Sequence, residues 1–345
     1  MRPKIALLVD WKQQEKKKFW LAEELERHGF IVKLIDIPKY NMKDRIIKWR
    51  KIILWLKYFK QALAVCLSKY RYYDYIISWN AVTGAFLALL ARLLFVVKPK
   101  IILLNLIAHE KAPFYKRLRR VIYRFCFKRA DIITTNSYKL NEYYWQEFRI
   151  AKEKIFVLTD PVESSSFEYV DITGYEQYDV FSGGEGARDW PTLFKAIELN
   201  PELSFIVIAR KKYFNVKKMP KNVDIYFDTE EDFFYQKMKA SKIVVLPLKS
   251  FITAGLIVLG KAMLMGKAVI ATRTPVTENY IVSGENGILV EMGNYHQLSD
   301  EIKRLIMDEA KIKILGKKAR ESILESHTEK KYCLRLIEIL GSQLK

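Results

Sequence analysis

Two loops in the second half of the sequence carry residue types that bind phosphate. The first follows an apolar run at residues 243–248 and contains Thr253, Ala254 and Gly255, after which a helix-forming stretch begins at Leu256. A strand, a short loop of small residues and a helix leave the N–H groups of the first helical turn free, and the helix dipole favours an anion there. An ordinary βαβ unit without a ligand explains this segment equally well.

The second loop, residues 182–190, also lies between a predicted strand and a predicted helix, and it contains Gly183, Gly184 and Arg188. Glycines let the backbone approach a ligand closely, and an arginine can bind diphosphate oxygens through two hydrogen bonds. The spacing matches neither a P-loop nor GxGxxG. A plain strand-to-helix turn is the simpler interpretation of this loop alone, but the two loops together favour a nucleotide-diphosphate site.

Other catalytic chemistry has little support. His109 lies just beyond the apolar run at residues 101–104 and is a candidate for substrate contact, with a loop histidine of no special role as the alternative. The sequence has no GxSxG, no HExxH and no Cys/His nucleophile pair. Three scattered cysteines without a CxxC predict neither a disulfide framework nor a zinc site, and they fit a reducing cytosol. The short apolar run near the N-terminus is not a signal peptide.

Strand and helix patterns alternate along both halves of the chain, which predicts doubly wound parallel sheets. The alternation pauses near residue 162 and then restarts, and 345 residues suit two domains. We therefore expect a first Rossmann-like domain at 1–162, a second at 163–328 and a final helix at 329–345. The apolar run at residues 81–97 is short for a membrane span and contains Arg92, so we interpret it as a buried helix that covers a sheet.

The charge is distributed unevenly. The net charge is +20, and residues 1–160 carry 33 Lys and Arg against 14 Asp and Glu, or +19, which leaves +1 for the remainder. This asymmetry indicates an anionic partner for the first half: a membrane surface, a nucleic acid or an acidic substrate.

Two basic helical stretches, residues 44–69 and 113–129, interleave cations with aromatic residues. This pattern suits helices that lie on anionic lipid, and a solvated basic face opposite a core face is the alternative. Nucleic acid is the rival partner, but the sequence lacks an RNP, helix-turn-helix, KH or zinc motif, so we expect no nucleic acid. The predicted membrane contacts are Lys48, Trp49, Lys51, Trp55, Lys116, Arg117 and Arg120.

Residues 228–287 resemble the donor domain of GT-B glycosyltransferases, specifically retaining family four. The resemblance rests on a series of motifs in the same order and spacing. They are residues 230–240, 241–247, 255–263 and 266–272, then Thr277 with Glu278, and residues 284–290. Residues 131–137, 155–158 and 160–162 with Gly183 and Gly184 extend the likeness over most of the chain. The resemblance implies the GT-B fold: two tandem Rossmann-like domains facing a cleft, with a C-terminal helix that crosses back to the first.

The resemblance also implies the chemistry. A sugar would pass from a nucleotide-diphosphate sugar to an acceptor hydroxyl with retention of configuration, without a metal or a cofactor. Because the first half is strongly basic, we further expect an acceptor that is lipid-linked or an envelope polysaccharide, with the protein at the inner face of the cell membrane. The matching diphosphate positions are Gly183, Gly184, Arg188, Gly255 and Leu256, with Thr253 and Ala254 in the same loop. Arg210 and Glu278 are candidate contacts for the donor sugar or nucleotide, and Asn105 and His109 are the catalytic candidates.

The sequence departs from the family pattern at two glutamates of the donor motif, whose positions hold Ile252 and Gly260. One of these glutamates contacts the donor sugar and the other contacts the ribose. The departure leaves a second interpretation open, a catalytically inactive GT-B relative that serves as a scaffold or binding partner in polysaccharide assembly.

Overall fold

A computed structural model describes the chain in two compact units. One comprises Met1–Thr159 with Tyr332–Lys345, and the other comprises Asp160–Lys331. The sequence-based boundaries, 162/163 and 328/329, lie within a few residues of these divisions. The described residues are 2–9, 19–36, 50–67, 72–107, 113–163, 177–185, 187–216, 219–251 and 256–342.

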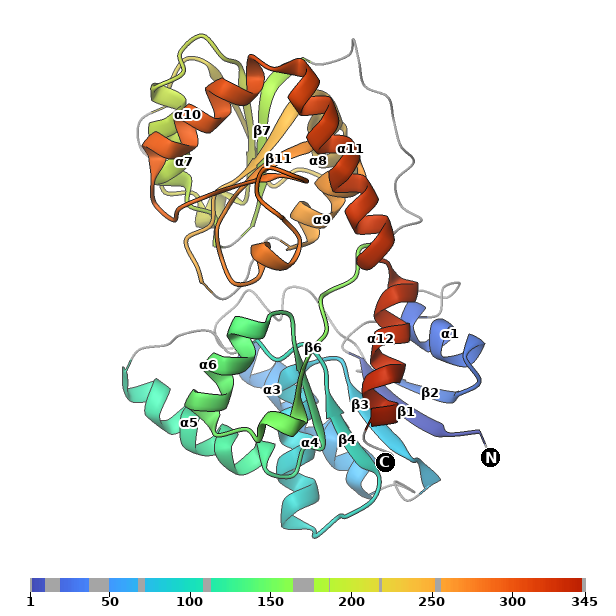
Figure 1. Ribbon diagram of the computed structural model, residues 1–345. Coiled ribbons are helices and arrows are strands. Elements are labelled where there is room, and N and C mark those ends of the chain that lie inside the picture. The colour runs from blue at the N-terminus through green and yellow to red at the C-terminus, as the bar shows by residue number, and fades with distance from the viewer. Residues whose placement is uncertain are drawn as a thin grey trace. The chain divides into compact units, whose positions relative to one another are not determined.

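The first unit has a six-stranded, fully parallel sheet in the order β2-β1-β3-β4-β5-β6 (Figure 1). Its strands are nearly continuous apolar runs because helices cover both faces of a parallel sheet, and all residues of β3 and β5 are buried. The strands are β1 (Lys4–Val9), β2 (Ile31–Asp36), β3 (Tyr75–Ser78), β4 (Lys100–Leu103), β5 (Ile132–Thr135) and β6 (Ile155–Val157).

The helices of the first unit follow its strands in turn. They are α1 (Trp20–Arg27), α3 (Arg50–Leu67), α4 (Ala81–Leu93), α5 (Pro113–Phe127) and α6 (Tyr138–Phe148), with the short 3-10 helix η2 (Lys152–Lys154). The last helix, α12 (Glu329–Ser342), returns to this unit, and from Tyr332 onward its buried residues join the core beside β1 and α1. The helix predicted for residues 81–97 is shorter in the structure, where α4 ends at Leu93.

The second unit has another six-stranded parallel sheet, in the order β12-β11-β10-β7-β8-β9. Its strands are β7 (Tyr178–Gly184), β8 (Phe205–Ala209), β9 (Val223–Phe227), β10 (Ser241–Leu246), β11 (Ala268–Thr272) and β12 (Ile288–Val290). Its helices are α7 (Trp190–Glu198), α8 (Glu231–Lys239), α9 (Leu256–Leu264), α10 (Tyr295–Ile306) and α11 (Glu309–Ser326), with 3-10 helices η4 (Lys211–Tyr213) and η5 (Thr277–Asn279). The doubly wound parallel fold predicted for both halves is confirmed.

Two contacts show how tightly the second unit is packed. Lys267 is 1% exposed, and its ammonium donates hydrogen bonds to the carbonyls of Lys239, at 2.6 Å, and Ser241, which satisfies the C-terminal end of α8. Gly316 of α11 lies against the backbone of Gly266, where an added Cβ would be 2.0 Å from the carbonyl oxygen. Only glycine lets α11 approach this closely.

Among the described residues, no helix combines the length and apolar character needed to cross a bilayer. The same part of the chain does not bring together three or more His, Cys, Asp or Glu side chains that could hold a metal ion.

Candidate nucleotide-binding site

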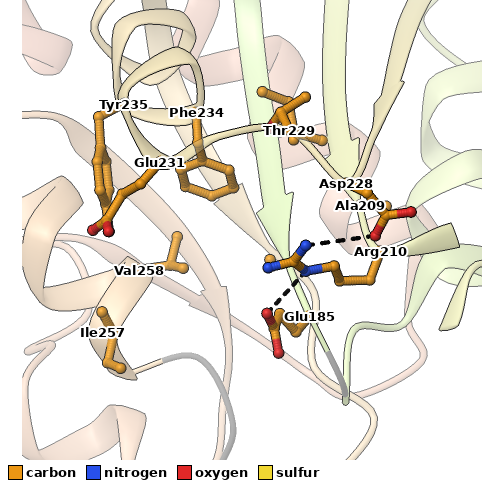
Figure 2. Close-up of a pocket in the computed structure, with 12 residues that line it drawn as sticks. Glu185, Ala209, Arg210, Asp228, Thr229, Glu231, Phe234, Tyr235, Ile257 and Val258 are labelled. Carbon is orange, nitrogen blue, oxygen red and sulfur yellow. Dashed lines mark hydrogen bonds and ion pairs between the residues drawn. The ribbon is translucent and has the colours of Figure 1, made fainter. Parts of the chain in front are cut away.

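A pocket of about 290 Å³ lies in the second unit at the carboxyl ends of β7, β8 and β9 (Figure 2). The N-terminal parts of α8 and α9 close its other side. Parallel α/β sheets bind ligands at the carboxyl ends of their strands, so the fold itself favours this place. Its apolar lining comes mainly from Ile208, Ala209, Phe234, Ile257 and Val258.

The strand order of the second sheet reverses between β7 and β10, and both predicted phosphate loops leave the sheet there. Ligands of doubly wound sheets bind at such a switch point. The structure joins the two loops by backbone hydrogen bonds: Asp189 N–H donates to Pro247 at 3.0 Å, and Lys249 N–H donates to Ala187 at 3.0 Å. Thr253, Ala254 and Gly255 lie outside the described residues, and Leu256 is the first residue of α9.

Arg188 is the most unusual side chain at this junction. It is 2% exposed, and its Nε donates a hydrogen bond of 2.8 Å to the carbonyl of Gly183. Burial lowers the pKa of the guanidinium to about 10, which still leaves it charged at neutral pH. Within the described residues no carboxylate forms an ion pair with Arg188. A buried charge without a counter-ion is costly, so an anion bound here would be favoured.

The two glycines before Arg188 have packing roles that the sequence did not reveal. A Cβ on Gly183 would lie 2.6 Å from the ring of Phe234, and a Cβ on Gly184 would lie 2.4 Å from Nη2 of Arg188. Gly184 also has a φ of +131°, which favours glycine. Since Gly184 lines the pocket, the guanidinium lies directly behind the pocket wall in space that a side chain would fill.

Comparisons with known proteins give one family match. The family described as "Glycosyl transferases group 1" matches residues 192–322, most of the second unit. This segment is similar to that family, and the match covers less than half of the chain. A comparison with curated protein sequences gives no match.

Solved glycosyltransferase structures share the fold of the whole chain. Sucrose-phosphate synthase from Thermosynechococcus elongatus aligns with 99% of this chain and 99% of its own, with a TM-score of 0.74 and 16% identity. The Anabaena protein HepE, in complex with UDP and glucose, aligns over 99% and 100%, with a TM-score of 0.66 and 18% identity. The lipopolysaccharide outer core galactosyltransferase WaaB, in its apo form, aligns over 99% of both chains, with a TM-score of 0.67 and 15% identity. At these identities the likeness establishes the fold alone.

In the second unit, the position of one glutamate of the family pattern has no room for a side chain. Gly260 of α9 is buried, and a Cβ there would lie 2.4 Å from Cγ2 of Val162. The other position, Ile252, lies outside the described residues. A different carboxylate lines the pocket: Glu231 of α8, whose side chain is 72% exposed and pairs with the Lys261 ammonium at 3.0 Å.

Arg210 lies in the pocket, but two carboxylates hold it. Its Nε donates to Glu185 at 2.9 Å, and its Nη1 lies 3.6 Å from Asp228 (Figure 2). The hydrogen bond with Glu185 is the main cause that raises the pKa of Arg210. This rim therefore presents more carboxylate than cation once Glu231 is included, which suits hydroxyl and N–H donors of a ligand better than phosphate.

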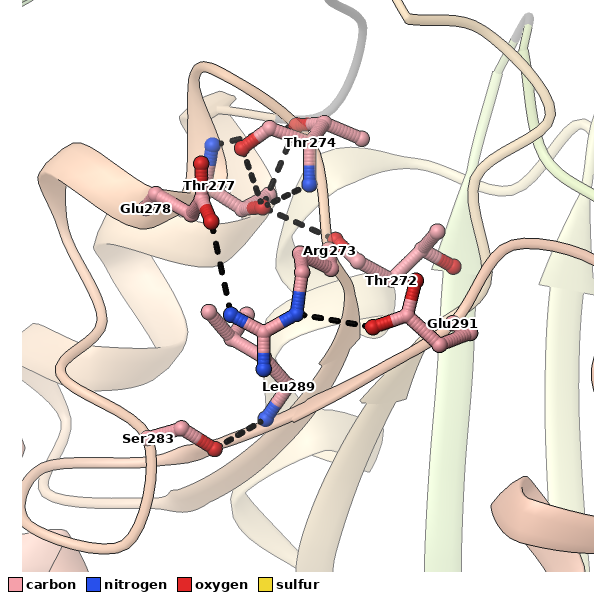
Figure 3. Close-up of polar contacts among 8 residues, drawn as sticks. All are labelled: Thr272, Arg273, Thr274, Thr277, Glu278, Ser283, Leu289 and Glu291. Carbon is pink, nitrogen blue, oxygen red and sulfur yellow. Dashed lines mark hydrogen bonds and ion pairs between the residues drawn. The ribbon is translucent and has the colours of Figure 1, made fainter.

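Glu278 does not line the pocket. It belongs to η5, and its carboxylate pairs with Arg273 at 3.3 Å, while Arg273 also pairs with Glu291 at 2.9 Å (Figure 3). Buried hydrogen bonds fix this turn, because the Thr277 hydroxyl donates to the carbonyl of Thr272 at 2.8 Å. The predicted donor contact by Glu278 stays a prediction.

The two catalytic candidates belong to the first unit. Asn105 lies two residues after the end of β4 and has a φ of +53°, a conformation that Asn tolerates better than most residues. Its backbone N–H donates to the Thr134 hydroxyl at 2.9 Å, and its buried Oδ1 has no hydrogen-bond partner in the described structure. His109 lies outside the described residues.

The predicted membrane residues are only partly described. Lys48 and Trp49 lie outside the described residues, as do the side chains of Lys51 and Lys116. Trp55 is 53% exposed and Arg117 is exposed. Arg120 instead forms two hydrogen bonds of 3.1 Å with the carboxylate of Glu147 on α6, which binds it within its own unit.

Sequence reasoning missed most of the pocket. Glu185, Asp228 and Glu231 come from three segments whose proximity only the sheet order reveals. Their position just after strand ends, or in the first turn of a helix, is the signal by which they could have been found.

Proposed function

We propose that this chain transfers a hexose from a nucleotide-diphosphate sugar to a hydroxyl of a lipid-linked or envelope-polysaccharide acceptor, with retention of configuration. The nucleotide sugar is the co-substrate, and the reaction needs neither a metal nor a further cofactor. The observation that carries the proposal is the buried Arg188 guanidinium, which lacks a carboxylate partner among the described residues and lies where the two loops meet at the switch point.

The diphosphate is the group that Arg188 would bind. As the bond between the sugar and the diphosphate breaks, negative charge grows on the leaving oxygens. A preorganised cation and the free N–H groups at the start of α9 stabilise that charge more in the transition state than in the ground state. We assign Gly183, Gly184 and the loop of residues 253–256 to the same subsite, because backbone hydrogen bonds hold the two loops together.

The nucleoside would occupy the neighbouring pocket. Ile208, Phe234 and Val258 provide apolar contact for a base, and the carboxylate-rich rim provides acceptors for ribose hydroxyls. We assign the ribose contact to Glu231, because Gly260 has no room for the family's glutamate and Lys261 already orients the Glu231 carboxylate. An acidic side chain from α8 would thus replace one from α9.

The acceptor would bind the first unit, with Asn105 and His109 as candidates for contact with the reacting groups. The unpartnered Oδ1 of Asn105 supports this role, since a buried acceptor without a donor is costly. The charge of +19 on residues 1–160 supports an anionic membrane surface as partner, with the protein peripheral on the cytoplasmic face. The likeness to WaaB, a lipopolysaccharide outer core galactosyltransferase, supports a glycan acceptor of this kind.

The test has two stages. Thermal unfolding is measured with UDP, GDP, ADP, CDP and dTDP, because a ligand that binds only the native state raises the unfolding temperature. The matching nucleotide sugars are then incubated with a membrane lipid extract, and release of nucleoside diphosphate is measured. Stabilisation by one nucleotide, followed by release from one of its sugars, is the expected result; no stabilisation by any nucleotide would contradict the proposal.

A second candidate function is an inactive scaffold or binding partner in polysaccharide assembly. The closed position at Gly260 favours it, because a glutamate of the donor motif cannot be present there. Nucleotide binding without turnover on any donor and acceptor would favour this function over the transferase.

A further inference from the structure

An exposed apolar surface lies at one edge of the first unit. Four apolar side chains at and after the end of α4 are exposed: Leu93 is 56%, Leu94 48%, Phe95 89% and Val97 82% exposed, while Val96 between them is buried. This segment joins the end of α4 to the start of β4, so it lies at the amino-terminal edge of the sheet, opposite the strand ends that carry Asn105. The sequence had predicted a buried helix here.

Helix α5 extends this surface. Val121 is 60%, Ile122 44% and Phe125 39% exposed, and their spacing of three and four residues places them on one side of the helix. Arg92 of α4 connects the two segments, because its Nη1 donates to the carbonyl of Phe125 at 2.7 Å and its guanidinium lies 3.9 Å from the centre of that ring. The apolar edge is the set Leu93, Leu94, Phe95, Val97, Val121, Ile122 and Phe125.

The exposure of the apolar edge is built into the fold. Arg129 donates hydrogen bonds to the carbonyls of Val96 at 2.7 Å, Val97 at 2.8 Å and Pro99 at 3.0 Å, and Asp131 holds the same guanidinium at 2.7 Å. Phe95 has a φ of +53°, an unfavourable backbone for a bulky side chain. Three hydrogen bonds from Arg129 thus fix the loop in a conformation that exposes its apolar side chains, although this conformation strains the backbone of Phe95.

The charged residues around the apolar edge indicate which partner covers it. Exposed Lys98 and Lys128 flank the apolar edge, whereas the nearby acids Asp131 and Glu147 are already paired with Arg129 and Arg120. An anionic bilayer offers apolar chains beneath negative headgroups, which complements apolar side chains ringed by cations. A second copy of the chain would bring like charges together, so self-association is disfavoured.

We infer that the apolar edge is a membrane-insertion surface, with Phe95 and Val97 entering the boundary between headgroups and acyl chains of an anionic bilayer. The inference rests on the proposed function for the membrane location. The sequence predicted membrane contact through helix faces around Lys51 and Lys116. The inference places the point of insertion at the tip of the loop after α4 instead. It is tested without any sugar donor, so failure of the inference and failure of sugar transfer are recognised separately.

The first experiment is vesicle flotation with phosphatidylcholine alone and with phosphatidylcholine containing phosphatidylglycerol. The variant carries Phe95→Asn and Val97→Ser; Asn suits the positive φ, so the fold is not put at risk. The control carries Met307→Ser and Ile314→Ser, which remove two exposed apolar side chains of the second unit, 79% and 51% exposed. We expect at least a tenfold loss of binding to anionic vesicles for the variant and no loss for the control. Equal binding of all three proteins would overturn the inference.

The second experiment places an environment-sensitive fluorophore at Val97→Cys, with Met307→Cys as the matched control. The native cysteines should not compete, because all three are buried and burial raises the thiol pKa of Cys66 and Cys126 to about 11 and of Cys333 to about 12. A blue shift on anionic vesicles at position 97 alone is expected. No shift at position 97, or light scattering that shows a dimer lost in the Phe95→Asn, Val97→Ser variant, would contradict lipid as the partner.

Discussion

The two units use the same six-stranded parallel architecture but fill their switch points differently. In the second unit the order reverses between β7 and β10, where Arg188 and the glycine loops lie. In the first unit it reverses between β1 and β3, where Trp79 packs edge-on against Phe19 and Trp20, with ring centres 5.2 and 5.8 Å apart. Parallel strands bring loops to one edge in both units, but the side chains there differ: a buried arginine in the second unit and packed aromatic rings in the first.

The largest effect should come from the cation at the second switch point. Arg188→Met should weaken nucleoside diphosphate binding about 100-fold, since it removes charge-assisted hydrogen bonds worth a few kcal/mol. Arg210→Met is the matched control, because Glu185 and Asp228 already neutralise that guanidinium. Calorimetry should show a loss of less than a few-fold for the control. Equal losses for the two variants would contradict the distinction between them.

Low pH should reduce the free energy of unfolding of the second unit, because His327 is buried there in its neutral form. This residue is 7% exposed, stacks on Tyr280 with ring centres 4.3 Å apart, and has its pKa lowered to about 4 by burial. The unfolded chain binds a proton below about pH 6.5 and the native chain does not, so the stability present above pH 6.5 falls as the pH drops towards 4. The full loss is about 3 kcal/mol.

Hydrogen exchange of second-unit peptides at pH 7.5 and 5 measures this loss, with the first unit as internal reference. His327→Phe keeps an aromatic ring against Tyr280 and should remove the His327 contribution to the pH dependence. A loss of protection at pH 5 that is the same in both proteins would show that other groups cause it.

Introducing the glutamate of the family pattern at position 260 should destabilise the second unit. Gly260→Glu would force a side chain against Val162, and overpacking of this kind costs about 1–3 kcal/mol. Urea unfolding should show this loss, and Val162→Ala should recover part of it. An unchanged midpoint would mean that the position is open and that the account of the missing carboxylate is wrong.

The smallest expected effect is a loss of nucleotide affinity when Glu231, at the rim of the pocket, is changed. Glu231→Gln should weaken nucleoside diphosphate binding about tenfold, the value of one hydrogen bond to a charged group. Glu278→Gln, whose carboxylate is paired with Arg273 outside the pocket, should change affinity less than twofold. The reverse ranking would assign the ribose contact to η5 instead of α8.

The fold was predictable because the strands of parallel sheets are nearly continuous apolar runs, which are easily recognised in the sequence. Apolar runs such as residues 243–248 and 101–104 predict strands buried on both faces, and the structure has β10 at Ser241–Leu246 and β4 at Lys100–Leu103, one or two residues earlier. Each of the two predicted phosphate loops follows such a run, although β7 continues to Gly184 and so includes the first residues of the loop predicted at 182–190.

The rest depended on packing between distant residues. Nothing near Gly260 in the sequence indicates that Val162 fills the space beside it, and nothing near residue 95 indicates that Arg129 holds that loop open. The run at residues 81–97 is apolar apart from a few residues such as Arg92, so its last residues were assigned to a buried helix. The structure instead exposes Leu93, Leu94, Phe95 and Val97.

A four-way calorimetric comparison tests the central claim most directly. The nucleoside diphosphate that binds best and its monophosphate are each titrated into the native protein and into Arg188→Met. If Arg188 binds the second phosphate, the native protein should prefer the diphosphate by about 100-fold and the variant should show almost no preference. The same diphosphate preference in both proteins would show that Arg188 does not bind that phosphate, and would contradict the account.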